Sequence, residues 1–525
     1  MLNRKLVILI PVLTIAETLP KIMKKEILII SCFIITLFCN CSKDKNIIND
    51  DNNGENIDIT TNLPPTNFNI SVEQVKYNSV LLKWDESTDP ENTTIKYSIY
   101  LENNLIQGNI SKLELKLENL TEVTTYNGYI IAEDEYEKTT RINFTFSTIK
   151  YYLTFIKEYE YINAANGGLF SPRLHEVLIT NDGNYLFSGT INLTPSGGGA
   201  FFTAKIDQEG NEVWFKKYDI DTGHGFPEIK ETSDGGFIIL GWYNFLKLDS
   251  LGNLEWSKTF PCGAQINCEL FSASETNDGN YLVGGHLSND WNTTLSTGVA
   301  TKAYLILIDN NGNILWKKSF GSTWSQSIRD IIHNGDNTFT VFGDIEASGY
   351  TYDPNQSNID NNFWVIKIDI DGNIIWEKSY GDGKMDFPKK IIKTSGNNFV
   401  FIGNSWGAYD ISESVIYKIN NNGNVIWNTP FQYSNSDSVY SVIENLTGEI
   451  MILNQTEVQY NQFSMVLNKY SRQGTLINNK FYTNYGGFDL KPTSDGGYIL
   501  ATSYGNNGSY YARILKTDPE GNFEE

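Results

Sequence analysis

A short pattern recurs along the last two thirds of the chain. A glycine–asparagine pair stands at 210–211, 252–253, 312–313, 372–373, 423–424 and 521–522, with a degenerate copy at Gly474-Thr475. Tryptophan follows most of these pairs, at Trp214, Trp256, Trp316, Trp376 and Trp427. Such self-similarity constrains the fold more than any other feature, because each repeat is one small unit that buries its apolar face only by stacking on the next.

Each repeat contains four short strand patterns. A turn such as TSDGG (232–236) separates the first two, and a segment such as FWVIKID (363–369) leads through a Gly-Asn turn into IIWEKSY (374–380). Seven such units predict an all-β, seven-bladed β-propeller over residues 150–525, with six or eight blades as alternatives. The last unit stops before its fourth strand, and the alternating segment 151–161 is expected to supply that strand and close the ring.

The repeats resemble those of quinoprotein and WD-repeat propellers. That resemblance implies the fold and says little about activity, because propellers host many functions. The acidic turn at Asp369 and Asp371 looks like the start of a calcium loop, but Gly372 falls at the wrong position for one. We therefore expect a hairpin turn there and no metal site, and we expect no cofactor.

Residues 63–149 predict a second all-β domain. Alternating segments at 79–84, 95–101, 125–134 and 142–148 indicate strands, and Trp84 is expected to anchor a sandwich core. The motifs that resemble a fibronectin type III domain are Leu82-Lys83-Trp84, Asp89-Pro90, Tyr97 and Leu120 to Tyr126. The resemblance implies a spacer or an adhesive module, and we expect a spacer.

Residues 1–41 predict a signal for export, with Met23 as the expected start. Two lysines precede an apolar run from Ile27 to Phe38, which is short for a membrane span, and Cys41 ends the run. This arrangement resembles a bacterial lipoprotein signal of the Bacteroidetes type, which implies a lipid on Cys41, with Cys39 as the alternative. An uncleaved transmembrane helix is the other interpretation. The polar residues 42–62 predict a flexible linker.

Charge and cysteines narrow the classes of partner. The net charge of −22 argues against nucleic acid, which needs concentrated Lys and Arg. The membrane is therefore expected to be reached only through the lipid anchor, at the outer membrane or cell surface. Cys262 and Cys268, six residues apart in an exported chain, predict a disulfide rather than a zinc site.

One face of the predicted propeller carries the variable loops, at 190–200, 286–303, 344–362 and 404–413. Loops on a rigid scaffold are the usual place for binding residues. The aromatic residues expected on this face, and predicted to bind a ligand, are Trp242, Tyr243, Trp291, Trp324, Tyr350, Tyr352, Trp406 and Tyr409.

No catalytic motif stands out, and no residue is predicted to be catalytic. The sequence has four histidines and lacks nucleophile-elbow, phosphate-loop and zinc-protease patterns. We expect a non-enzymatic binding or scaffold lipoprotein whose ligand is a glycan or an envelope protein. The alternatives are a polysaccharide hydrolase or lyase, and an envelope-assembly scaffold.

Overall fold

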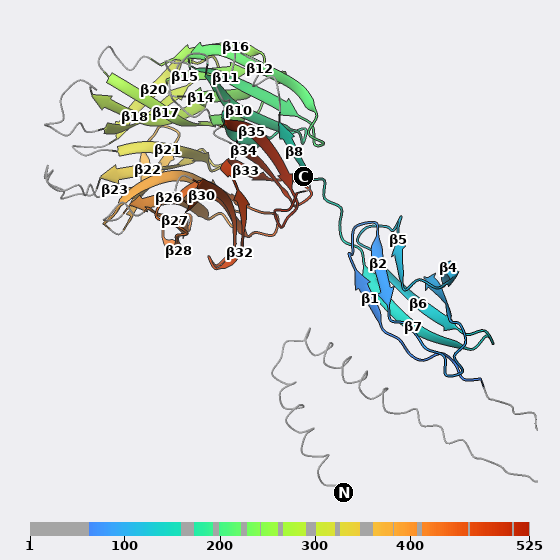
Figure 1. Ribbon diagram of the computed structural model, residues 1–525. Helices are drawn as coiled ribbons and strands as arrows, with labels where there is room; N and C mark the ends of the chain where they lie inside the picture. The colour runs from blue at the N-terminus through green and yellow to red at the C-terminus, as the bar shows by residue number, and fades with distance from the viewer. Residues whose placement is uncertain are drawn as a thin grey trace, which may run out of the picture. The chain divides into compact units, whose positions relative to one another are not determined.

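The computed structural model describes most of the chain from residue 62 onward (Figure 1). The described residues are 62–158, 173–192, 199–221, 228–241, 243–260, 266–289, 301–320, 326–346, 361–381, 383–406, 412–459, 462–506 and 509–523. All regular elements in these ranges are β-strands, as predicted. No helix long and apolar enough to cross a bilayer occurs within them. The chain forms two compact units, with the boundary between Thr148 and Ile149. Residues 121–123 are the exception, because they group with the second unit.

The first unit is a sandwich of two antiparallel sheets. One sheet has the order β1–β2–β5, with β1 (Ile70–Glu73), β2 (Val80–Trp84) and β5 (Glu114–Leu117). The other has the order β4–β3–β6–β7, with β3 (Lys96–Leu101), β4 (Asn104–Ile110), β6 (Thr125–Glu133) and β7 (Thr139–Ser147). Trp84 is 5% exposed in the core between the sheets, with its ring centroid 5.7 Å from that of Tyr97. The predicted anchoring role of Trp84 is confirmed.

The second unit is a β-propeller, in which the described strands pair into seven antiparallel groups of four. The first three groups are β9 (Arg173–Ile179), β10 (Tyr185–Asn192), β11 (Gly199–Ile206), β12 (Glu212–Asp221); β13 (Glu228–Glu231), β14 (Phe237–Gly241), β15 (Asn244–Leu248), β16 (Leu254–Thr259); and β17 (Ile266–Glu275), β18 (Tyr281–Asn289), β19 (Thr301–Ile308), β20 (Ile314–Phe320). The next two, joined by one parallel pairing, are β21 (Gln326–His333), β22 (Thr338–Glu346), β23 (Asn361–Asp369), β24 (Ile374–Tyr380); and β25 (Met385–Lys393), β26 (Phe399–Trp406), β27 (Ser412–Ile419), β28 (Val425–Phe431). The last two are β29 (Ser438–Glu444), β30 (Ile450–Gln459), β31 (Gln462–Tyr470), β32 (Leu476–Thr483); and β33 (Tyr485–Pro492), β34 (Tyr498–Asn506), β35 (Ser509–Thr517), β8 (Phe155–Glu158).

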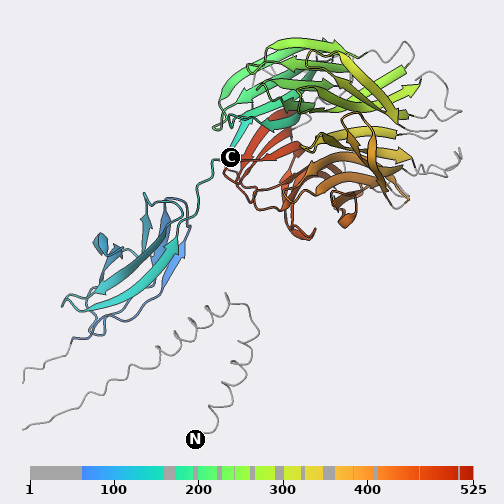
Figure 2. The same cartoon turned by 180° about the vertical axis from the view of Figure 1, so that it is seen from behind.

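The sheets form a closed ring. The innermost strand of each group lies beside the innermost strands of its two neighbours, in the order β9, β13, β17, β21, β25, β29, β33 and back to β9. In both views the last sheet, drawn in red, lies beside the first, drawn in green (Figures 1 and 2). The segment before the repeats supplies β8, which pairs with β35 through Leu515 and Ile156. The last sheet therefore joins strands from both ends of the propeller sequence, as predicted.

The repeated glycine and tryptophan residues interlock neighbouring sheets. A Cβ atom added to Gly252 would lie 2.7 Å from the ring of Trp214, and one added to Gly474 would lie 2.7 Å from Trp427. Each tryptophan belongs to the outermost strand of one sheet, and each glycine belongs to the last turn of the next. At the closure, Phe155 takes the place of tryptophan against Gly210, at 3.0 Å. Tryptophan therefore packs between neighbouring blades.

The carboxylates of these turns bind the turn itself. Asp369 accepts the backbone N–H of Asn373 on Oδ1 at 2.8 Å, and the Asn373 side-chain amide donates to Oδ2 at 2.9 Å. The turns at Asp249 and Asp309 repeat this geometry. The stretch that looked like a calcium loop is thus a hairpin turn held by its own aspartate.

Substituting a turn glycine tests the interlock. Gly252 and Gly279 have φ of 76° and 74°, so alanine at either site loses about 1 kcal/mol of stability through left-handed strain. Only Gly252→Ala also displaces a tryptophan, which costs about 1–3 kcal/mol more. Gly279→Ala is the matched control, because nothing lies within 4 Å of its added Cβ. Urea unfolding of the full chain measures both; equal losses would contradict the interlock.

Candidate functional site

Six of the seven innermost strands carry a β-bulge. In each, the pairing with the second strand skips one residue, and the skipped residues are His175, Phe271, Arg329, Lys389, Tyr440 and Phe488. We call these six residues the collar, and the propeller face on which the innermost strands begin the collar face. Bulges re-aim side chains and occur often beside functional sites.

The collar side chains contact one another across sheet boundaries. The Phe488 ring centroid lies 6.0 Å from that of His175 and 6.1 Å from that of Tyr440. The Lys389 amine lies 5.9 Å from the centre of the Tyr440 ring, and the Arg329 guanidinium lies 4.0 Å from that of Phe271. Lys389 is exposed and the other five are half-buried. The collar therefore combines aromatic and cationic groups that solvent reaches.

A second set of polar residues follows the bulges along the same strands. We call it the axial cluster, and its members are Glu176, Glu228, Lys230, Ser272, Asp330, Lys390, Ser441, Asp489 and Lys491. Glu228 occupies the corresponding position of β13, whose pairing shows no shift. These side chains are buried or half-buried, so each needs a partner.

The axial cluster joins five of the seven pairs of neighbouring sheets through backbone donors. The backbone N–H of Ile229 donates to Glu176 at 2.8 Å, Ala273 to Glu228 at 2.8 Å, Ile331 to Ser272 at 3.1 Å, Ile391 to Asp330 at 3.0 Å and Val177 to Asp489 at 3.3 Å. In every case the donor belongs to the innermost strand of a neighbouring sheet. A hydrogen bond to a charged group contributes about 1.5–3 kcal/mol, so these bonds hold the ring together at its axis.

The lysines of the axial cluster neutralise its carboxylates. Lys390 Nζ lies 2.7 Å from Asp489 Oδ1 and 3.8 Å from Glu176 Oε1, and Lys491 also pairs with Asp489. Although burial opposes them, the two lysines hold the pKa of Asp489 well below its usual range. Burial raises the pKa of Glu228 to about 7, against the lowering effect of Lys230. The axial cluster thus has its charges engaged internally.

Further charged groups lie beside Arg329. Its Nε lies 4.0 Å from Oδ1 of Asp344, and His286 Nε2 lies 3.9 Å from Oε2 of Glu269. Burial raises the pKa of both Glu269 and Asp344, and Arg329 partly offsets that rise. Burial lowers the pKa of His286 to about 4, so this imidazole is neutral at neutral pH. This corner of the collar thus holds two carboxyl groups and a neutral imidazole near Arg329.

Two of the eight predicted aromatic residues fall in the described part of the chain. Trp406 ends β26 and is 49% exposed, with its ring centroid 5.2 Å from that of Phe387, which precedes Lys389 by two residues on β25. Tyr243 is half-buried in the turn between β14 and β15, where its carbonyl accepts the N–H of Phe260 at 2.9 Å. The predicted residues outside the described ranges are Trp242, Trp291, Trp324, Tyr350, Tyr352, Tyr409, Cys41 and Cys262. Cys268 lies on β17, and its disulfide stays a prediction.

Sequence reasoning missed the collar and the axial cluster, although a signal was present. When the repeats are aligned, adjacent polar or aromatic residues stand before a buried aliphatic residue, as in Arg329-Asp330-Ile331 and Phe488-Asp489-Leu490. A simple strand would point two adjacent side chains to opposite faces. The bulge explains why both matter here.

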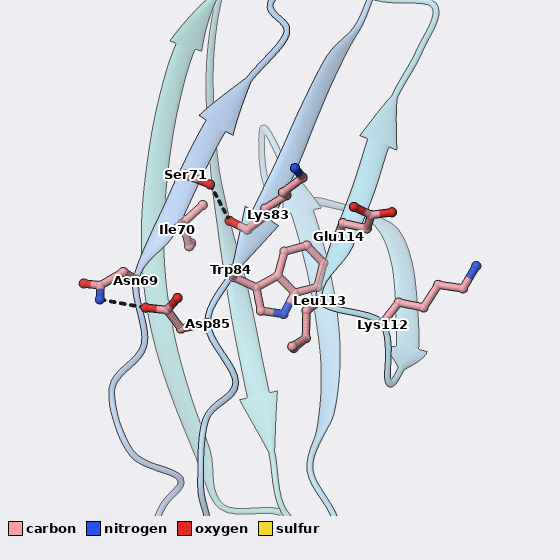
Figure 3. Close-up of a pocket in the computed structure, with 9 residues that line it drawn as sticks. All are labelled: Asn69, Ile70, Ser71, Lys83, Trp84, Asp85, Lys112, Leu113 and Glu114. Atoms are coloured by element: carbon pink, nitrogen blue, oxygen red, sulfur yellow. Dashed lines mark hydrogen bonds between the residues drawn. The ribbon is translucent and has the colours of Figure 1, made fainter.

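The sandwich has an open pocket of about 820 Å³ along β1, β2 and β5 (Figure 3). The Trp84 ring lies among its lining residues, next to Leu113. Its polar side chains already bond neighbours: Asn69 donates to Asp85 at 2.8 Å, and Lys83 pairs with Glu73 at 2.9 Å. The collar is the stronger candidate site, because among the described residues Lys389 has no ion pair and Arg329 has one, at 4.0 Å.

The raised pKa of Glu228 predicts a pH effect on stability. Because the pKa of about 7 exceeds the 4.5 of an unperturbed glutamate, the contribution of this group is complete below pH 4.5 and falls as the pH rises to 7. The free energy of unfolding of the wild type should fall by about 1–3 kcal/mol between pH 4.5 and pH 7, and that of Glu228→Gln should fall by less. Urea unfolding at both ends of the window measures this. Glu212→Gln, on exposed β12, is the control; an unchanged slope in Glu228→Gln would contradict the assignment.

Comparison with solved structures gave matches of low identity and low TM-score, so the propeller assignment rests on the strand pairing above. A protein of unknown function from Bacteroides caccae is 14% identical, with 54% of this chain and 90% of that chain covered and a TM-score of 0.34. The WD40 domain of Neurospora crassa Pan2 is 12% identical, covering 65% and 89%, with a TM-score of 0.40. The β-propeller domain of the Trilobed protease from Pyrococcus furiosus is 10% identical, covering 67% and 94%, with a TM-score of 0.38. No curated protein matched the chain. Residues 63–145 match the family model of the fibronectin type III domain, and this part of the chain is such a domain.

Proposed function

We propose that this chain is an exported binding protein that holds its ligand on the collar face of the propeller and performs no chemistry on it. The observation that supports the proposal is the collar, in which partly exposed aromatic rings and two cations surround the propeller axis. Aromatic and arginine side chains dominate the binding energy of many interfaces. The ligand is a glycan or another protein of the cell envelope.

Features of the N-terminal sequence support a location at the cell envelope. Lipidation at Cys41 tethers the mature chain to the outer membrane or cell surface, and its strong negative charge keeps it off anionic headgroups. The fibronectin type III domain then serves as a spacer between the anchor and the propeller. A lipid anchor and a spacer suit a protein that presents a binding surface.

Binding by the collar face is tested with the full chain on a glycan array and in a pull-down from envelope extract. Phe488→Ala and Trp406→Ala should each weaken binding about threefold to tenfold, since one aromatic contact contributes about 0.5–1.5 kcal/mol. Phe481→Ala is the matched control, because Phe481 is 45% exposed on β32, an outermost strand. Full binding by both collar-face variants would overturn the assignment of the face.

A polysaccharide hydrolase or lyase is the second candidate, and one observation favours it. Glu269 and Asp344 both lie near Arg329, and burial raises the pKa of both carboxyl groups. A carboxyl group whose pKa is raised by burial is a candidate general acid. Release of new reducing ends from envelope polysaccharides, abolished by Asp344→Asn, would support this candidate over simple binding; its absence across the same polysaccharides would reject it.

A further inference from the structure

We propose that the collar recognises the carboxylate of an acidic sugar, with Arg329 and Lys389 binding the charge and Phe271, Tyr440 and Phe488 packing on the sugar ring. The proposal rests on the proposed function and names the ligand class for the same face. Three observations carry it: the poor compensation of the two cations, their position beside aromatic rings, and the internal pairing of the nearby carboxylates.

The two cations of the collar are poorly compensated. Within the described residues the single ion pair of Arg329 is the 4.0 Å contact from Nε to Asp344, which leaves its terminal N–H donors without a carboxylate. Lys389 forms no ion pair in that part of the chain, and its amine faces the Tyr440 ring at 5.9 Å. Arg329 and Lys389 are the skipped residues of β21 and β25, which are neighbouring innermost strands. An anion between them would relieve their repulsion.

The acids of the axial cluster do not supply that anion. Asp489 is held by Lys390 and Lys491, and Asp330 accepts the N–H groups of Ile331 at 2.8 Å and Ile391 at 3.0 Å. Turning Asp330 toward the collar would leave the backbone N–H of Ile391 unpaired, at about 1–3 kcal/mol. The acids of the axial cluster therefore leave Lys389 and the terminal N–H groups of Arg329 available to a ligand, although the chain as a whole carries −22.

The chemistry of the collar fits a carboxylate on a sugar. A guanidinium binds a carboxylate through two parallel hydrogen bonds, which gives geometric selectivity that a lone amine lacks. The rings of Phe271, Tyr440 and Phe488 are half-buried, so each presents part of a flat apolar surface on which the C–H face of a sugar can pack. Only two cations are present, which suits a single carboxylate better than a long polyanion such as nucleic acid.

The test uses a pair of ligands that differ only in charge. Isothermal titration of the full chain with an oligogalacturonide and with its methyl ester measures the contribution of the carboxylate. Wild type should bind the acid at least tenfold more tightly than the ester, and added salt should reduce that preference. Equal affinity for acid and ester, or binding of neither, would overturn the proposal. The array and pull-down judge the proposed binding function independently.

Substitutions test which residues cause the preference for the acid over the ester. Lys389→Met should reduce the preference for the acid about tenfold and leave binding of the ester unchanged, and the exposed position of Lys389 allows the fold to persist. Arg329→Gln should do the same, with thermal unfolding checking that the Phe271 contact is not needed for folding. Lys317→Met, on the exposed face of β20, is the matched control. A full preference in Lys389→Met and Arg329→Gln would overturn the assignment.

Two further measurements distinguish recognition of an acidic sugar from general anion binding and from turnover. Inorganic phosphate or sulfate that displaces the oligogalacturonide at equal concentration would show a general anion site and overturn the sugar assignment. Ultraviolet absorbance from an unsaturated uronate product would show turnover. That outcome would support carboxylate recognition while it overturned the non-enzymatic part of the proposed function.

Discussion

The propeller depends on backbone hydrogen bonds that cross from sheet to sheet at its axis. An antiparallel sheet satisfies its own ladder, but the innermost strand of each sheet has one edge with no further strand to pair. Here five groups of the axial cluster each accept an N–H from a neighbouring innermost strand, as Glu176 does from Ile229. A rim of glycine–tryptophan contacts completes the ring at the outer edge, where Trp214 packs on Gly252. Both sets of contacts recur with the sequence repeats, so neighbouring blades are joined by similar local contacts.

The same bulge that supplies the axial bonds also creates the candidate site. Skipping one residue places that residue beside the axial group instead of on the opposite face of the strand. Where the skipped residue is Arg329, Lys389 or an aromatic residue, its side chain can bind a ligand. The hydrogen bonds of the axial cluster are kept. Adjacent residues therefore have different roles. The charges of the axial cluster pair with one another, whereas the collar faces solvent.

The predicted functional face stays a prediction, and the candidate residues that the structure describes are only partly the predicted ones. Trp406 is exposed at the expected end of its sheet, whereas the collar comes from innermost strands that the sequence analysis treated as scaffold. His286 illustrates the difference, since it lies within β18 beside Glu269 rather than in a loop. Loops were favoured because function often resides there, and a strand residue re-aimed by a bulge escapes that rule.

The sequence by itself determined the all-β architecture, the sandwich anchored by Trp84, the turn glycines and the closing strand at 155–158. These features are local or periodic: a left-handed turn needs glycine, and a repeated tryptophan needs the same pocket each time. Only the tertiary structure decided that Arg329 lies over Phe271, that Lys390 pairs with Asp489, and that His175 contacts Phe488. Those contacts join residues as far apart as the two ends of the propeller, because ring closure sets them side by side and no local pattern encodes such a distance.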